Sequence, residues 1–108
     1  MDGLWTAEFG SSVGIFGGGV VVFQDGKLLG GDGGYFYTGE YTLEGDTFNA
    51  QLKAAPFIEN YESIFRTVGS DLSLVLVGTL LDEKHAVAQG NPSGAPLLKF
   101  GVKLTKRF

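Results

Sequence analysis

His85 and its neighbours are the residues of this chain whose types best suit acid–base chemistry. His85 is the only histidine, and it follows Asp82, Glu83 and Lys84 in a segment whose composition predicts a hairpin turn. A general base needs a positioned partner and a cleft, and a solvated turn supplies neither. We therefore expect no catalytic residue here and interpret the chain as a binding protein rather than an enzyme.

The sequence also lacks the residues of a metal or cofactor site. It contains no cysteine, which excludes disulfides, thiolate nucleophiles and cysteine-ligated zinc. No calcium loop of the Asp-x-Asp-x-Asp-Gly type occurs. The glycine-rich segment 14–19 is followed by valines rather than by the helix that a phosphate-binding loop would open. We expect no metal and no cofactor, and we predict a connection or bulge at 14–19.

A second glycine-rich segment surrounds Asp32, at positions 30–34. Glycines beside a short carboxylate are typical of turns that need positive φ angles. We expect this segment to have a conformational role.

Acidic side chains form the strongest candidate for a binding surface. The net charge is −4, which disfavours direct binding to nucleic acid phosphates. Nine carboxylates face two lysines up to Phe65, whereas six basic residues face three acids beyond it. Glu40, Glu44 and Asp46 lie at or near a predicted turn, where they should be exposed side by side. This asymmetry predicts either a polar binding surface or an ordinary solvated exterior.

The elements that must position these residues are strands. The 108 residues suit a single domain, 1–108, and the 18 glycines disfavour a helical protein. Alternating apolar residues, separated by turn signals such as Asp25-Gly26 and Glu44-Gly45-Asp46, recur about eight times along the chain. We predict an all-β, antiparallel, lipocalin-like barrel. Gly39 interrupts an aromatic strand face and indicates a bend or a close backbone approach.

One segment breaks the alternation. Between residues 56 and 68, apolar side chains recur every three or four residues, with Pro56 near the start and Gly69 after the end. This spacing fits one short amphipathic helix that closes a barrel mouth. An irregular strand remains the alternative.

The inward strand faces supply a candidate lumen. An eight-stranded barrel has an interior that side chains just fill or that holds one small ligand. A void of about 300 Å³ or more would favour a ligand, and a filled interior would favour protein binding. The candidate lumen residues are Trp5, Phe9, Phe48, Leu52 and Phe100.

The start of the chain bears on localisation. Met1 to Trp5 lacks the basic and apolar regions of a signal peptide, and no apolar run approaches a membrane span. We expect a cytoplasmic protein with no membrane partner.

Several short segments, spread over nearly the whole chain, together resemble one known family. They are Asp2-Gly3, Gly18–Phe23, Asp25-Gly26, Gly30-Gly31-Asp32, Tyr35–Gly39, Ser63-Ile64-Phe65 and Leu98–Leu104. In their order and spacing they resemble the GrlR-like negative regulators of type III secretion. The resemblance implies a lipocalin-like barrel, a bacterial homodimer, and repression by sequestering a helix-turn-helix transcriptional activator. The family's activator-binding loop is Glu-Asp-Glu-Asp, and the matching turn here retains two acids, Glu44 and Asp46.

Two functions follow from these observations. The first is a dimeric regulatory module that offers an acidic surface, centred on Glu40, Glu44 and Asp46, to a protein partner. The second is a carrier or sensor whose lumen holds a small apolar ligand. Self-association is expected through a strand edge or an apolar barrel face.

Overall fold

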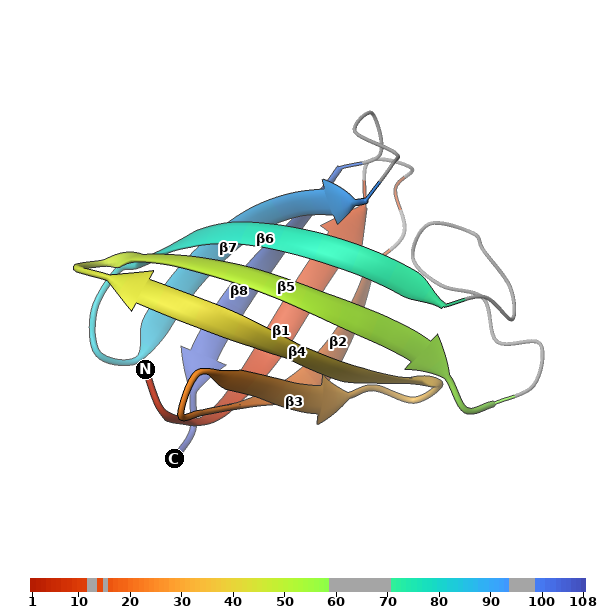
Figure 1. The fold of residues 1–108 in the computed structure, drawn as a ribbon, viewed down its shortest axis with the longest axis horizontal. Coiled ribbons are helices and arrows are strands. Elements are labelled where there is room, and N and C mark those ends of the chain that lie inside the picture. The colour runs from red at the N-terminus through yellow and green to blue at the C-terminus, as the bar shows by residue number, and fades with distance from the viewer. Residues whose placement is uncertain (12–13, 15, 59–70, 94–98) are drawn as a thin grey trace.

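The chain forms a closed barrel of eight antiparallel strands in sequence order, with β8 pairing back onto β1 (Figure 1). The computed structural model describes residues 1–11, 14, 16–58, 71–93 and 99–108. The predicted all-β, antiparallel barrel of about eight strands is therefore confirmed. The strands are β1 (Gly3–Ser11), β2 (Phe16–Gln24), β3 (Lys27–Gly31), β4 (Tyr35–Glu44), β5 (Thr47–Pro56), β6 (Leu72–Leu80), β7 (His85–Pro92) and β8 (Phe100–Lys106).

No helix occurs within the described ranges. Pro56 is the last residue of β5, so the segment predicted as helix or irregular strand begins at the end of a strand. The greater part of that segment, from 59 to 68, lies outside the described residues.

The period-two pattern of β1 has the predicted orientation. Trp5 and Ala7 are buried, whereas Glu8 is exposed and Thr6 is half-buried on the outer face. Successive side chains of a strand point to opposite faces, so the apolar set enters the barrel together. Trp5 and Ala7 belong to the hydrophobic core, and the half-buried Phe9 packs against it.

Two tight turns join neighbouring strands at one end of the barrel, which we call the turn end. Asp25 and Gly26 both have positive φ angles, 50° and 79°, as the central residues of a type I′ turn require. In the β4–β5 turn only Gly45 has a positive φ angle, 59°. Both predicted hairpins are confirmed, and the Asp82–Lys84 turn between β6 and β7 lies at this same end.

Gly39 lies where the backbone of β5 comes close to β4, as predicted. A Cβ atom at this position would lie 2.2 Å from the carbonyl oxygen of Gln51 and 2.7 Å from the Cα of Leu52. Only glycine fits so close to a neighbouring backbone.

The predicted connection or bulge at 14–19 was wrong for most of its length. Gly17, Gly18 and Gly19 belong to β2 and pair with Phe9, Glu8 and Ala7. Ladder hydrogen bonds use only backbone groups, so glycine can extend a strand even though it contributes no side chain to packing.

Three aromatic side chains plug the turn-end half of the barrel. Trp5, Phe23 and Phe48 are at most 1% exposed. The ring centroids of Trp5 and Phe23 lie 6.1 Å apart and those of Phe23 and Phe48 lie 6.2 Å apart, both edge to face. This geometry favours contact between aromatic quadrupoles. The interior of the barrel is therefore solid at this end.

Candidate functional site

A cavity of about 100 Å³ occupies the interior beyond the aromatic plug. Its wall is mostly aliphatic and aromatic, with three polar residues. The volume falls short of the roughly 300 Å³ of a typical small-molecule site. The lining residues are Ala7, Phe9, Val21, Phe23, Leu28, Asp32, Tyr35, Tyr37, Leu52, Ala54, Leu72, Leu74, Leu76, Phe100, Val102 and Leu104.

The five candidate lumen residues divide into two groups. Phe9, Leu52 and Phe100 line the cavity, whereas Trp5 and Phe48 do not and belong to the plug instead. Phe23 belongs to both sets, because it is part of the plug and also lines the cavity, so it marks the boundary between the filled and the open part of the barrel.

A polar cluster at the cavity wall was not identified as a site from the sequence. The carboxylate of Asp32 accepts hydrogen bonds at Oδ1 from the backbone N–H groups of Gly34, at 2.9 Å, and Tyr35, at 2.8 Å. Its Oδ2 accepts a hydrogen bond from the Tyr37 hydroxyl. Asp32 orders the connection between β3 and β4 through these hydrogen bonds, but the expected positive φ angles are absent, because Gly30 and Gly31 belong to β3 and no glycine of the 30–34 segment has a positive φ. Asp32 also lines the cavity. The available signal was an aspartate between glycines, followed at five residues by an inward tyrosine.

Glu40 does not join the other two acidic candidates. It lies on the outer face of β4, and its carboxylate Oε1 is 3.3 Å from Nζ of Lys27 on β3. Glu40 and Glu44 are four residues apart on one strand, which is about 13 Å at the usual rise per residue. The exposed carboxylate of Glu40 is thus paired on the barrel wall, away from the β4–β5 turn.

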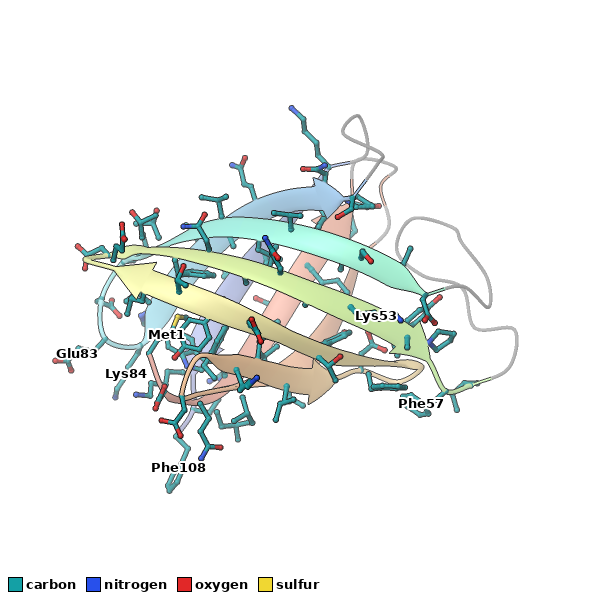
Figure 2. All side chains as sticks on the ribbon, viewed as in Figure 1. Met1, Lys53, Phe57, Glu83, Lys84 and Phe108 are labelled. Carbon is teal, nitrogen blue, oxygen red and sulfur yellow. The ribbon has the colours of Figure 1, made fainter. Side chains whose placement is uncertain are left out.

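Glu44 and Asp46 are exposed at the β4–β5 turn, and a second turn lies beside them. The backbone N–H of Leu80, at the end of β6, donates a 2.7 Å hydrogen bond to the carbonyl oxygen of Asp46. Leu81 follows and is 61% exposed. Figure 2 places Glu83 on the same side of the barrel as this turn, and Lys53 and Phe57 at the opposite end. We call Glu44, Asp46, Leu81 and Glu83 the acidic tip.

His85 is held by a local interaction in the same region. Its Nδ1 lies 2.9 Å from Oδ1 of Asp82, which also accepts a 2.8 Å hydrogen bond from the N–H of Lys84. The Lys84 N–H, followed by His85, lowers the pKa of Asp82. Both side chains of the pair are more than half exposed. This geometry orders the β6–β7 turn and does not form a cleft for acid–base chemistry.

Five apolar side chains form a continuous surface on the outside of four adjacent strands. Leu4, Val22 and Leu29 face one another across β1, β2 and β3, and Val20 and Phe36 continue the surface through Gly31. Phe36 is 46% exposed and Leu29 is 47% exposed. Large contiguous apolar patches on soluble proteins are typical of interaction sites. We call Leu4, Val20, Val22, Leu29 and Phe36 the β1–β4 apolar face.

The closed barrel shows that one of the two surfaces expected for self-association, a strand edge, is absent from the described strands. Each of the eight described strands has a neighbour on both sides, so the sheet has no edge strand. Two copies therefore cannot associate by pairing their edge strands, because the described barrel has none. Of the two surfaces expected for self-association, only an apolar barrel face exists among the described strands, and self-association through it stays a prediction.

Within the described ranges, no helix is long and apolar enough to cross a membrane. The same residues contain no cluster of three or more histidine, aspartate or glutamate side chains that could hold a metal ion. A scan against models of protein families matches none of them, and a search of curated proteins finds no match.

Proposed function

We propose that this chain is a cytoplasmic regulatory module that binds a protein partner through the acidic tip and works as a homodimer. By its resemblance to GrlR-like negative regulators, the partner is a helix-turn-helix transcriptional activator of type III secretion. Sequestering that activator would prevent it from binding DNA. The chain would then regulate transcription without contacting DNA itself.

The observation that supports this proposal most directly is the hydrogen bond from the Leu80 N–H to the Asp46 carbonyl. It brings the β4–β5 turn next to the end of β6, so that the exposed Leu81 and exposed carboxylates of both hairpins lie at the same end of the barrel. Carboxylates attract a basic DNA-binding partner during encounter, and burial of an apolar side chain slows its dissociation. The acidic tip therefore combines charges that attract a partner with an apolar side chain that the partner can bury.

The experiment uses the purified activator bound to a fluorescently labelled operator DNA, with fluorescence anisotropy as the readout. Adding the protein in excess should release the DNA, because the activator cannot hold both partners. Leu81→Ser should weaken this release severalfold. Val77→Ser, which changes an exposed valine on the outer face of β6, is the matched control and should behave as wild type.

If saturating protein leaves the activator on its DNA, the proposed function is wrong. If Leu81→Ser and Val77→Ser release the DNA equally well, sequestration stands but the acidic tip is not the binding surface.

The cavity supports a second candidate function, a carrier or sensor for a small apolar ligand. Its roughly 100 Å³ are lined mainly by aliphatic and aromatic side chains. An engineered apolar cavity of about 150 Å³ takes up benzene, so a ligand here would be of that size or smaller. The test is whether a small hydrocarbon shifts the methyl resonances of the cavity wall.

A further inference from the structure

Asp32 is the one acidic residue among the described residues that line the mainly apolar cavity. Among the described residues that line it, Asp32, Tyr35 and Tyr37 are polar, and the others are alanine, valine, leucine and phenylalanine. In such surroundings one hydrogen bond has a large influence on which molecule is bound, because a polar group left without a partner is costly. The chemistry of Asp32 therefore decides which polar group the cavity accepts.

The hydrogen bonds of Asp32 leave room for one more donor. An ionised carboxylate has about four acceptor positions. Oδ1 uses both of its positions, for the N–H groups of Gly34 and Tyr35. Among the described residues, Oδ2 accepts one hydrogen bond, from the Tyr37 hydroxyl. One acceptor position of Oδ2 is thus available to a molecule in the cavity.

We infer that the cavity binds a small apolar molecule carrying one hydrogen-bond donor, an alcohol or an amine, with the donor directed at Oδ2 of Asp32. The inference rests on the second candidate function and is independent of the acidic tip. It excludes the carboxylic acids that apolar barrel lumens could otherwise hold, because a ligand carboxylate would face the negative charge of Asp32. It also limits the ligand to about six non-hydrogen atoms, since the cavity is smaller than one that holds benzene.

Four five-membered-ring compounds of nearly equal size test the need for a hydrogen-bond donor separately from the need for an apolar ring. Cyclopentanol and cyclopentylamine carry a donor, cyclopentanone carries only an acceptor, and cyclopentane carries no polar group. Each is titrated into methyl-labelled protein, and the methyl resonances of Leu52, Leu74 and Val102 report binding inside the barrel. The alcohol and the amine should each bind at least about tenfold more tightly than the ketone, as expected for a hydrogen bond to a charged acceptor.

Asp32→Asn tests the role of the carboxylate while keeping the turn. The amide oxygen can accept the two backbone hydrogen bonds of Oδ1, and the amide nitrogen replaces Oδ2 with a donor. The preference for the alcohol and the amine over the ketone should disappear in this variant. Asp46→Asn, which removes an exposed carboxylate at the other end of the barrel, is the matched control and should keep the preference.

The outcomes separate this inference from the second candidate function. If the four compounds shift the methyl resonances but the ketone binds as tightly as the alcohol and the amine, the role of Asp32 is refuted and the lumen remains a ligand site. If none of the compounds shifts these resonances, both the ligand site and the role of Asp32 are refuted.

Discussion

The Tyr41 hydroxyl on β4 donates a 2.8 Å hydrogen bond to Oδ1 of Asp2, 39 residues earlier in the chain. This contact joins the segment before β1 to the aromatic plug, because the Tyr41 ring also packs edge to face on Phe23 at 5.0 Å. Burial and the hydrogen bond to Asp2 raise the pKa of Tyr41 to about 12. The same hydrogen bond lowers the pKa of Asp2.

The raised pKa predicts a loss of stability in alkaline solution. Below pH 10, Tyr41 is protonated in both the folded and the unfolded protein. Between about pH 10 and pH 12 the unfolded tyrosine releases its proton while the folded one keeps it, so the free energy of unfolding falls as the pH rises. The measurement is urea unfolding of wild type and Tyr41→Phe at pH 9 and at pH 11.5. The difference in free energy of unfolding in favour of wild type should be smaller at pH 11.5. A constant difference would contradict this assignment.

The β6–β7 turn predicts the opposite trend in acid. The pKa of Asp82 is lowered from 3.8, chiefly by the hydrogen bond from the Lys84 N–H and then by His85. The ionised Asp82 carboxylate therefore contributes to the free energy of unfolding above pH 3.8. This contribution is lost as the pH falls through and below that value, because the carboxylate of the unfolded chain takes up a proton first. The melting temperatures of wild type and Asp82→Asn should therefore converge between about pH 4 and pH 2. Parallel curves across this range would argue against a stabilising charge at Asp82.

Two glycines in strands should respond very differently to an added methyl group. Gly39→Ala places a Cβ atom 2.2 Å from a backbone oxygen of β5, and backbone cannot rotate away as a side chain can. We expect a loss of about 1 to 3 kcal/mol in the free energy of unfolding. Gly101→Ala, whose Cβ would meet no atom of the described residues within 4 Å, is the control, with a change below about 0.5 kcal/mol. Equal effects in denaturant unfolding would show that strand propensity, and not the close approach, determines the result.

Gly39 also illustrates which features of the fold can be predicted from the sequence. Its place in the aromatic face of a strand predicted the close approach, and Asp25-Gly26 predicted its hairpin, because both signals depend on local backbone geometry. The separation of Trp5 and Phe48 from the cavity could not be predicted in this way. Alternation shows that a side chain points inward, but its height along the barrel axis depends on the register of all eight strands. The position of Asp32 in the cavity wall was missed for the same reason.

The β1–β4 apolar face predicts the mode of self-association. A twofold dimer buries the same surface on both copies, so one substitution removes two contacts. Wild type should sediment as a dimer at micromolar concentration, and Leu29→Lys should sediment as a monomer with an unchanged fold. Val77→Lys, at an exposed valine on β6, should remain dimeric. A wild-type protein that is monomeric at its highest soluble concentration would refute the dimer.

The acidic tip predicts an effect on the rate of partner binding. Exposed charges contribute little to folding, so Glu44→Lys combined with Asp46→Lys should keep the melting temperature within a few degrees. Stopped-flow measurements should show slower association with the activator, most strongly at low salt, where screening is weakest. Glu40→Gln should have a smaller effect because Lys27 already neutralises that carboxylate. An association rate that is unchanged in the double variant would exclude electrostatic steering by the tip.

The pairing of β8 with β1 has a consequence for how the barrel is made. Seven of the eight strand pairs join neighbours in sequence and can form as local hairpins, but the last brings Trp5 opposite Lys106. Pairing of β1 with β8 closes a loop of nearly the whole chain. The conformational entropy of that loop is lost before the contacts between the two strands can compensate for it, and this slows folding. During synthesis, β1 has to wait for β8 to leave the ribosome. Until then β1 exposes one unpaired backbone edge, and the nascent chain is open to mispairing with other chains.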